Sequence, residues 1–283
     1  MLKIVVFSEE IGWHGAQLKA AFTARNVEAI FVSLQDCAID LSREKPRIHI
    51  PHVDKLPTAV FVRGIAGGTL QQITTRLNIL QSLKVLGVSV YNDGKAIERT
   101  VDKAMTSFLL HKNGVATPKT WVCESSKQAE NIIASNPQLV IKPLFGSQGA
   151  GVRLVDKMPL PMDNYVDGVF YLQTFIKAPS DYRVLVVNNK AVAAMKRTGE
   201  TWLHNVAQGA QCEKTDEKDV LSIALQAALV LDIAYCGVDV IRDKNKQLFV
   251  LEINSIPAWR GLQSVTDVSI AQVLVDDFLT KIK

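Results

Sequence analysis

Residues 139–151 read LVIKPLFGSQGAG. The segment begins as a short apolar run, which predicts a strand, and continues into a loop with three glycines in six residues. Glycine leaves the backbone N–H groups of such a loop uncovered, so a phosphate oxygen can approach them closely. The loop matches neither GxxxxGKS/T nor a GxGxxG that opens a helix, which argues against a P-loop and a dinucleotide-binding fold. Two interpretations stay open for this glycine loop: a phosphate-binding loop and an ordinary β-hairpin turn.

Lys142 stands at the end of the predicted strand, directly before the glycine loop. A lysine in so apolar a run is expected to be half-buried, and a phosphate would satisfy its charge. The alternative is a lysine on an edge strand with its ammonium group in water. The position next to the glycine loop favours the phosphate-binding role.

A second group of polar residues lies nearer the C-terminus, where Asp239 precedes Glu252 and Asn254. Glu252 and Asn254 are two residues apart on a predicted strand, so their side chains share one face of a sheet. If residues 243–246 form a four-residue hairpin loop, Asp239 lies opposite Val250 and diagonally from Glu252, roughly 7–8 Å away. Three oxygen-bearing side chains then converge, and such ligands suit Mg²⁺ bound together with phosphates. A loop with an odd number of residues would reverse the alternation, and the competing interpretation is a polar stripe that faces solvent.

Several cationic side chains lie at the ends of other predicted strands. Arg183 stands near the start of one strand, and Lys196 and Arg197 end the next. Lys103 lies in a predicted helix, and Asn205 follows the second strand. Any one of these residues could be a surface charge, but their common placement indicates a clamp for phosphate oxygens during transfer.

The order of the predicted elements indicates a mixed α/β and α+β protein with three lobes. We expect an N-terminal α/β lobe at residues 1–97, a small lid at residues 98–172 and a C-terminal lobe at residues 173–283. In the first lobe, residues 12–15 are expected to form a loop before the first helix. The other elements are predicted strands at residues 2–7, 59–63, 88–91, 119–123, 182–187, 191–196, 237–242 and 247–253, and predicted helices at residues 17–22, 70–86, 100–112, 220–233 and from about 270.

The composition is that of an ordinary globular protein, with 283 residues, 48% hydrophobic residues and a net charge of +4. This charge is too small to indicate a nucleic-acid partner, although it suits an anionic ligand. The four cysteines are scattered and form no CxxC pair, which argues against a disulfide framework or a zinc site. No signal peptide and no membrane-spanning segment are recognisable, so we expect a cytoplasmic protein without a membrane partner.

Taken together, these elements resemble the ATP-grasp superfamily and, more narrowly, the RimK-like α-L-glutamate ligases. The resemblance covers nearly the whole chain, and its separated motifs occur in the right order. They are Lys103, Lys142-Pro143 with the glycine loop, Asp181-Tyr182-Arg183, Asn205, Asp239, and Glu252-Ile253-Asn254. The fold that this implies is the three-lobed ATP-grasp fold, with ATP between the lid and a metal-bearing C-terminal lobe.

The resemblance also implies roles for individual residues. The set implied to bind the nucleotide is Lys103, Lys142, Gly146, Ser147, Gln148, Gly149, Gly151, the adenine-binding hinge Gln173-Thr174-Phe175-Ile176, Asp181 and Lys196. Arg183, Arg197 and Asn205 would act on the transferring phosphate and the substrate. Asp239, Glu252 and Asn254 would hold Mg²⁺, for which Mn²⁺ could substitute.

The chain departs from the family pattern at three positions. The family usually has an acid where Thr174 stands, an arginine where Gln208 stands and a glycine where Ala210 stands. The first departure concerns the grip on the ribose, and the other two concern how the acyl phosphate or the amino acid is held.

The segment Asn254 to Leu262 is most similar to ligases that add glutamate to tetrahydromethanopterin-type one-carbon carriers. The implied activity joins a small-molecule carboxylate to the amine of L-glutamate through an acyl phosphate, with ATP, Mg²⁺ and release of ADP. Trp259 and Arg260 could supply a stacking face and a carboxylate fork, or they could be a packed aromatic and a surface arginine. Arg63, which ends a predicted strand, is a third candidate substrate residue.

Two other functions are compatible with the sequence. One is a ligase that modifies a protein C-terminus, as in ribosomal-protein glutamylation. The other is an ATP-binding regulatory module without catalysis, which the departures at Thr174, Gln208 and Ala210 would favour and the three retained metal positions oppose. A homo-oligomer is compatible with each of these functions.

Overall fold

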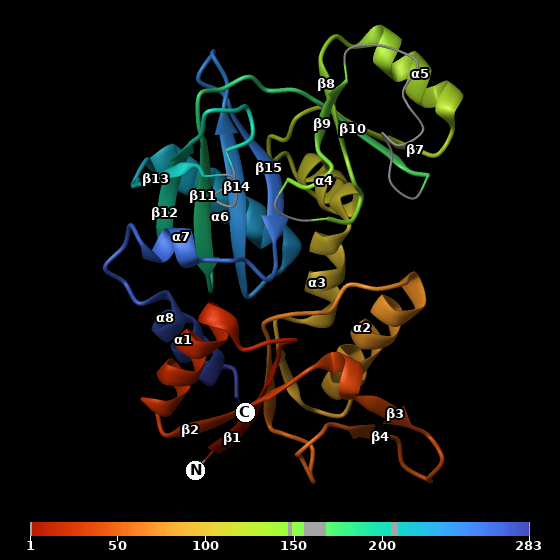
Figure 1. Cartoon of the computed structure of the whole chain (residues 1–283), viewed down its shortest axis with the longest axis vertical. Coiled ribbons are helices and arrows are strands. Elements are labelled where there is room, and N and C mark those ends of the chain that lie inside the picture. The colour runs from red at the N-terminus through yellow and green to blue at the C-terminus, as the bar shows by residue number, and fades with distance from the viewer. Residues whose placement is uncertain (1, 147–148, 156–167, 205–208, 283) are drawn as a thin grey trace.

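The computed structural model describes residues 2–146, 149–155, 168–204 and 209–282 and has three lobes (Figure 1). The predictions for Ser147, Gln148, Asn205 and Gln208 lie outside these residues. The mixed α/β and α+β class is confirmed, because one sheet is parallel and the two sheets that face the candidate site are antiparallel. The residue limits given above for the three lobes stay a prediction.

The N-terminal lobe is a parallel sheet in the order β2-β1-β5-β6, covered by helices on both faces. In β1 (Leu2–Phe7), Ile4 and Val6 pack with α1 and α8, whereas Val5 and Phe7 pack with α2. Because both faces are buried, the strand is apolar at successive positions rather than at alternate ones. The remaining elements of this lobe are α1 (Gly12–Thr23), β2 (Val27–Val32), η1 (Leu34–Asp36), β3 (Ala38–Asp40), β4 (Arg47–His49), β5 (Ala59–Val62), α2 (Leu70–Val85) and β6 (Ser89–Tyr91).

The expected loop at residues 12–15 is wrong, because helix α1 already begins at Gly12. Gly15 is buried in the first turn of this helix. A Cβ atom at Gly15 would lie 3.2 Å from Cε1 of Phe31 in β2. The glycine therefore allows the helix to lie close to the sheet instead of interrupting the helix.

The predicted helix at residues 100–112 is divided into α3 (Gly94–Val101) and α4 (Lys103–Lys112). Asp102 lies between them and accepts hydrogen bonds at Oδ1 from the N–H groups of Ala104 and Met105, so it caps α4. The lid sheet follows in the order β7-β10-β8-β9. Its elements are β7 (Thr120–Cys123), α5 (Ser126–Ser135), β8 (Leu139–Lys142), β9 (Arg153–Val155) and β10 (Phe170–Thr174).

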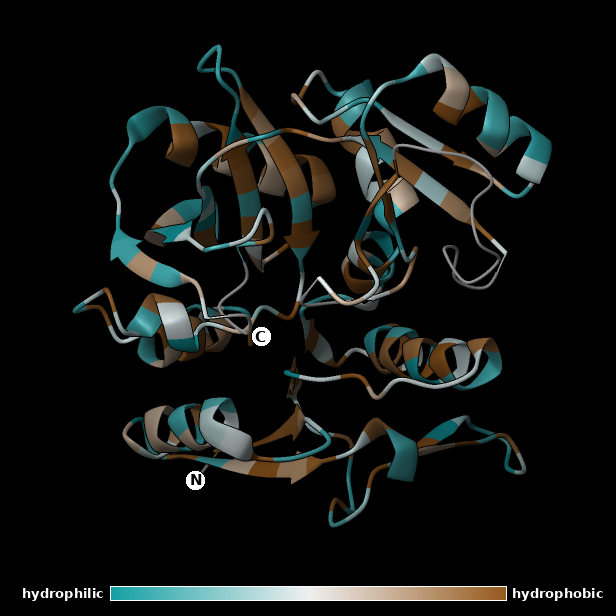
Figure 2. Ribbon diagram, turned by 45° about the horizontal axis from the view of Figure 1, so that its top comes forward, coloured by the Kyte–Doolittle hydropathy of each residue, from teal (hydrophilic) through white to brown (hydrophobic). Residues whose placement is uncertain are grey.

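The C-terminal lobe is a five-stranded antiparallel sheet in the order β13-β12-β11-β14-β15. Helix α6 covers one face of this sheet, and the other face packs in part against the N-terminal lobe. In Figure 2, hydrophobic strands lie inside the lobes and hydrophilic segments lie on the outer helices and loops. The elements are β11 (Asp181–Val187), β12 (Lys190–Thr198), β13 (Gln211–Lys214), α6 (Lys218–Leu231), β14 (Tyr235–Arg242), β15 (Leu248–Asn254), α7 (Arg260–Gln263) and α8 (Ile270–Thr280).

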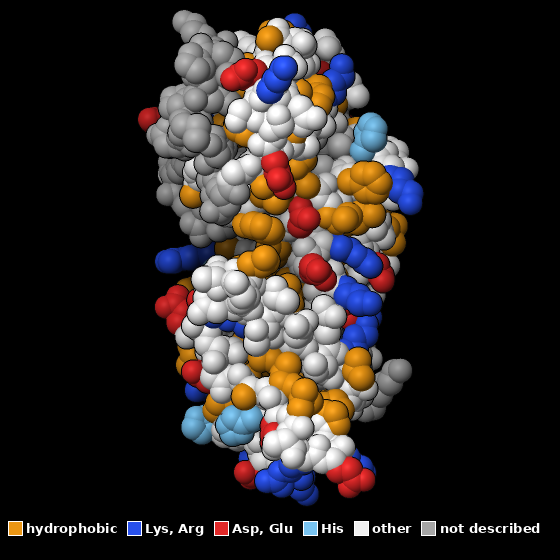
Figure 3. All heavy atoms as spheres, turned by 90° about the vertical axis from the view of Figure 1, so that its right-hand side faces the viewer, with side chains coloured by type: hydrophobic (Ala, Val, Ile, Leu, Met, Phe, Trp, Pro, Cys, Tyr) orange, Lys and Arg blue, Asp and Glu red, His pale blue; other side chains and the backbone are white. Residues whose placement is uncertain are grey.

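The C-terminal helix α8 returns to the N-terminal lobe and lies beside α1 (Figure 1). Arg25, in the turn after α1, binds the carboxylate of Asp276 of α8 through two nitrogens. On the face shown in Figure 3, acidic and basic side chains are interspersed with hydrophobic ones. None of the helices in the described part of the chain combines the length and the apolar composition that crossing a membrane requires.

Asn92 joins the N-terminal lobe to the strands that carry the candidate site. Its side chain is fully buried, accepts hydrogen bonds from the N–H groups of Ala234 and Tyr235, and donates to the carbonyl groups of Tyr235 and Ser255. Ser255 directly follows Asn254, and its hydroxyl group is hydrogen-bonded by Thr100 at 2.7 Å. The end of β15 is therefore fixed by the preceding lobe.

We expect Asn92→Ala to lower the free energy of unfolding by roughly 3 kcal/mol or more, because each buried polar group left unsatisfied costs about 1–3 kcal/mol. Urea unfolding followed by circular dichroism measures this loss. Asn78→Ala, at an exposed position of α2, is the matched control and should stay within about 0.5 kcal/mol of the wild type. Equal stability of the two variants would contradict this role of Asn92.

Candidate active site

A cavity of about 100 Å³ lies between the lid sheet and the C-terminal sheet. It brings together most of the residues that the sequence predicted for a nucleotide, one of the predicted catalytic residues and two of the three predicted metal ligands. These are Lys103, Lys142, Gly146, Gly149, Gln173, Thr174, Phe175, Ile176, Asp181, Arg197, Asp239 and Glu252. We call this the nucleotide cavity.

The glycine loop forms the hairpin turn of one interpretation, and the phosphate-binding role of the other stays a prediction. Strands β8 and β9 pair antiparallel, so the loop joins a β-hairpin, and its residues Gly146 and Gly149 also line the nucleotide cavity. Gly151 has a φ of 74°, and a Cβ atom there would lie 2.7 Å from Cγ of Pro143. Lys103 donates hydrogen bonds from Nζ to the carbonyl groups of Gly146 at 2.8 Å and Leu144 at 3.3 Å. Lys103 thereby holds the start of the loop over the cavity.

Lys142 lies inside the lid sheet, because β8 is flanked by β10 and β9. The alternative of a lysine on an edge strand is therefore wrong. Its Nζ donates a hydrogen bond of 2.6 Å to Oε1 of Gln173, whose Nε2 donates in turn to Thr120 and Tyr171. Lys142 forms no ion pair with the described residues, and burial lowers the pKa of its ammonium group to about 8. A buried cation held only by a neutral amide is well suited to receive an anion.

The predicted adenine hinge is only partly available for hydrogen bonding. The N–H group of Thr174 donates to the carbonyl of Lys119 at 2.9 Å, and that of Phe175 donates to the carbonyl of Gln138 at 3.1 Å. These two donors are already used by the protein. The Phe175 ring contacts Trp202 edge to face, with ring centroids 5.5 Å apart, and both residues line the cavity. A planar base would therefore meet aromatic rings here.

The predicted register of the β14–β15 hairpin is wrong, but the predicted convergence is present. Arg242 pairs with Leu248, so the loop between the strands has five residues rather than four. A bulge between Asp239 and Val240 leaves Leu251 unpaired and restores the alternation. Asp239 therefore lies directly opposite Glu252 instead of diagonally from it. Leu251 lines the nucleotide cavity.

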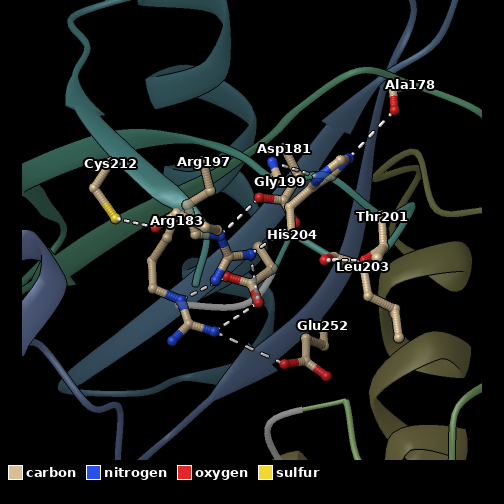
Figure 4. A network of polar contacts seen from close by, with 12 residues as sticks. Ala178, Asp181, Arg183, Arg197, Gly199, Thr201, Leu203, His204, Cys212 and Glu252 are labelled. Carbon is tan, nitrogen blue, oxygen red and sulfur yellow. Dashed lines mark hydrogen bonds and ion pairs between the residues drawn. The ribbon is translucent and has the colours of Figure 1, made fainter. Parts of the chain in front are cut away.

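Two arginines and two aspartates form a buried network of ion pairs on the same face of the sheet (Figure 4). Arg183 binds Asp239 through two hydrogen bonds of 2.6 Å. Arg197 binds Asp181 at 2.7 and 2.8 Å and also reaches Asp239 at 3.2 Å. Glu252 lies at the edge of the network, 3.9 Å from Nη2 of Arg183. The register explains these pairs, because Arg183 is opposite Asp239 and Arg197 is opposite Asp181.

The electrostatics of this network keep Asp239 ionised. Burial alone would raise the pKa of its carboxyl group, but Arg183 and Arg197 outweigh burial and lower the pKa to about 2.

Gly237 lies two residues before Asp239, and a Cβ atom at Gly237 would lie 2.9 Å from Cβ of Pro257 and 3.9 Å from Cδ of Arg183. The absence of a side chain at Gly237 thus leaves room for Pro257 to pack against β14.

The donor set predicted for a metal consists of two carboxylates and one amide. Nδ2 of Asn254 donates to Oε1 of Glu252 at 3.0 Å, which leaves Oδ1 as the atom that Asn254 could offer to a cation. Hard oxygen donors of this kind fit Mg²⁺. Among the described residues there is no group of three or more His, Cys, Asp and Glu side chains that could hold a metal. The site therefore fits a cation that takes its other ligands from phosphates.

Three predicted residues lie elsewhere than expected. Lys196 pairs with Tyr182 on the sheet face that α6 covers, because residues alternate along β12 and Arg197 takes the face of the cavity. Trp259 is 1% exposed and packs in the core, so its ring offers no stacking face to a ligand. Arg260 is exposed at the start of α7, with its guanidinium 6.0 Å from the Trp13 ring. Arg63 lies at a second cavity, described below.

Trp202, Leu203 and His204 also line the nucleotide cavity, and the sequence did not predict them. His204 is buried, accepts a hydrogen bond at Nδ1 from the N–H group of Gly199, and contacts the carbonyl of Ala178 through Nε2 at 3.3 Å. The backbone donor at Nδ1 places the proton on Nε2. The only signal in the sequence was their position directly before Asn205.

Three comparisons with known proteins agree with this geometry. The family model of the RimK-like ATP-grasp domain matches residues 100–278, which is more than half of the chain. The chain is 30% identical to a tetrahydromethanopterin:α-L-glutamate ligase of Methanococcus maripaludis, over 100% of this chain and 99% of that protein. It is 36% identical to the ligase of the same name from Methanocaldococcus jannaschii, over 69% of this chain and 72% of that protein.

The solved structures show the same fold. The ATP-grasp ligase PsnB complexed with a minimal precursor matches with a TM-score of 0.76 and 19% identity, over 99% of this chain and 98% of that chain. PsnB complexed with the minimal precursor, Mg and ADP matches with a TM-score of 0.73. These matches define the fold as that of an ATP-grasp ligase. The chain belongs to the RimK-like ATP-grasp family and is a ligase that forms carbon–nitrogen bonds.

We expect Asp239→Asn to destabilise the fold by about 3–5 kcal/mol, because it leaves the buried guanidinium of Arg183 without its carboxylate and removes one ion pair of Arg197. The contribution of Asp239 to the free energy of unfolding should be complete above about pH 4 and be lost as the pH falls toward the folded-state pKa of about 2. Urea unfolding at several pH values measures both effects.

Glu252→Gln is the matched control, since the Glu252 side chain is 29% exposed and lies at the edge of the same network. Its stability should change by less than about 1 kcal/mol. Equal losses in the free energy of unfolding for Asp239→Asn and Glu252→Gln would contradict a structural role for the charge of Asp239.

Proposed function

We propose that this protein is an ATP- and Mg²⁺-dependent ligase that adds L-glutamate to the carboxylate of a tetrahydromethanopterin-like one-carbon carrier. The observation that carries the proposal is the nucleotide cavity, where Lys103, Lys142 and Glu252 lie between the lid sheet and the C-terminal sheet. The two relatives named tetrahydromethanopterin:α-L-glutamate ligase support the choice of acceptor.

The cations of the cavity would bind the phosphates of ATP. Lys142 exchanges its hydrogen bond to Gln173 for a phosphate oxygen, and Lys103 exchanges the carbonyl groups of the glycine loop. In both exchanges a charged phosphate oxygen replaces a neutral acceptor, and a hydrogen bond to a charged acceptor is the stronger one. The backbone N–H groups of the glycine loop add further donors.

Glu252 and Asn254 would hold Mg²⁺, and Asp239 would join them if it shared its carboxylate with Arg183. The ion would neutralise charge on the β- and γ-phosphates. Arg183 and Arg197 are fixed by buried ion pairs, so they can stabilise negative charge at the transferring phosphoryl group without reorganising first.

The reaction needs no protein nucleophile. The acceptor carboxylate attacks the γ-phosphate of ATP, which breaks the bond to the β-phosphate oxygen and releases ADP. The amine of L-glutamate then attacks the acyl carbon, loses a proton and expels inorganic phosphate. The contribution of the protein is to position the reactants and to neutralise their charges.

A peptide acceptor is the second candidate, because PsnB binds a precursor peptide in the solved structures. That likeness is 19% identical in sequence, whereas the small-molecule ligases reach 30% and 36%. The small-molecule acceptor is therefore the better supported of the two.

Lys142→Met should weaken ATP binding by about tenfold or more, because a hydrogen bond to a charged group contributes roughly 1.5–3 kcal/mol. In the wild type, ATP affinity should fall as the pH rises through about 8, where Lys142 loses its proton, and the variant should lack this dependence. Calorimetric titration with ATP between pH 7 and 9 tests both, with Lys127→Met on the exposed face of α5 as the control. Unchanged affinity in a folded Lys142→Met protein would rule out the role.

Product analysis tests the function as a whole. Incubation with ATP, L-glutamate and a tetrahydromethanopterin-type acceptor should form one ADP and one phosphate for each glutamyl residue gained, as read by mass spectrometry. AMP and pyrophosphate as products would contradict the mechanism. Activity that requires a ribosomal-protein tail and ignores the pterin would transfer the function to the protein-modifying alternative.

A further inference from the structure

A second cavity, of about 470 Å³, adjoins the nucleotide cavity. It lies between residues 63–67 after β5, helix α4 and strand β15, and both cavities are lined by Lys103, Gly146 and Glu252. Its volume falls in the range of about 300–1,000 Å³ that is usual for small-molecule sites. Apart from these shared residues, its wall is largely apolar and includes Ile65, Leu77, Ile97 and Leu110. We call it the substrate cavity.

Arg63 is positively charged and lines the substrate cavity but not the nucleotide cavity. Its guanidinium forms no hydrogen bond and no ion pair with the described residues, and its buried Nε has no partner. Glu9 lines the same cavity but forms no ion pair with Arg63. Burial lowers the pKa of Arg63, as expected for a cation that lacks a counter-ion.

The backbone and the neighbouring ring hold Arg63 in place. Its N–H group donates to the carbonyl of Phe7 at 2.8 Å, and its guanidinium lies 5.0 Å from the centre of the buried Trp259 ring. Burial and the charges of Arg63 and Arg260 lower the pKa of His14 to about 4, so the imidazole beside Trp259 is neutral. This corner therefore holds positive charge without an anion to balance it.

Arg76 shows how the same lobe treats an arginine with a structural role. Arg76 is 5% exposed, whereas Arg63 is half-buried, and Nη1 of Arg76 donates to the carbonyl groups of Ala66 at 2.6 Å and Gly67 at 2.9 Å. The protein satisfies Arg76 but not Arg63. Burying an unpaired charge is costly, so a guanidinium kept in this state is poised for an anion that the protein itself does not supply.

We propose that Arg63 binds a carboxylate of the incoming amino acid, one that takes no part in the reaction. This rests on the proposed function, which places the reacting acceptor carboxylate at the shared end of the two cavities, near Lys103 and Glu252. The amine adds to the acyl carbon from one face of the carbonyl group, and the substrate cavity adjoins this shared end with the volume to hold the amino acid. L-Glutamate carries two carboxylates that do not react, and the planar fork of an arginine matches their geometry. Trp259 supports the guanidinium from beneath instead of touching the ligand.

The test is calorimetric titration of L-glutamate into the full chain with ADP and Mg²⁺ present, which requires no turnover and no acceptor. Arg63→Met should weaken binding by at least about tenfold, since it removes a charged hydrogen-bond donor and keeps the stem. Arg63→Lys, which keeps the charge but loses the fork, should give an intermediate affinity. Arg47→Met, an exposed arginine of β4 outside both cavities, should leave the affinity unchanged.

Stability separates ligand binding from a structural role. The thermal midpoint of Arg63→Met should be equal to or above that of the wild type, because no hydrogen bond or ion pair to the protein is lost. Unchanged glutamate affinity, or no glutamate binding by the wild type, would overturn the proposal. A rise confined to the KM of the acceptor would also overturn it, by moving the role to the other substrate. Failure of the proposed function would appear separately, as the absence of an amide product from wild-type protein.

Discussion

The buried pairing of Arg183 and Arg197 with Asp239 and Asp181 is the interaction on which the rest of the site depends. Taking four charges out of water is tolerable only because each guanidinium meets a carboxylate through two well-aligned hydrogen bonds. The pairs cross from β11 to β12 and from β11 to β14, so they also lock the three strands in register. A site that must handle phosphates thus has its cations fixed by the sheet itself.

Contacts from the other two lobes also fix the strands and side chains of the site. Asn92 fixes both the start of β14 and the residue after β15, which are the two strands that carry Asp239 and Glu252. On the other side of the cavity, the ammonium group of Lys142 donates a hydrogen bond to the neutral amide of Gln173, which a phosphate would replace under the proposed function. Among the described residues, the charges that maintain the geometry are paired within the protein, whereas Lys142 and Arg63 form no ion pair. Under the proposed function, that contrast separates structural charges from ligand-binding ones.

Much of this architecture could be predicted from the sequence, because it depends on local signals. The apolar run before the glycine loop located β8 and Lys142, and the spacing of Glu252 and Asn254 located one face of β15. The register could not be read, because it depends on a five-residue loop and a bulge at Leu251 that compensate for each other. The pairing of Arg183 with Asp239 also escaped, since β11 and β14 are neighbours only in space. The burial of Trp259 could not be predicted for the same reason, because the core around it is formed by residues that are far apart in the sequence.

The central claim is that the acceptor carboxylate attacks the terminal phosphate of ATP between the lid and the C-terminal sheet. The most direct measurement follows the oxygen atoms of that carboxylate. With an acceptor labelled by ¹⁸O in the reacting carboxylate, the account predicts that each turnover transfers one labelled oxygen to inorganic phosphate. Appearance of the lost labelled oxygen in AMP or in water, with none in inorganic phosphate, would contradict an acyl phosphate.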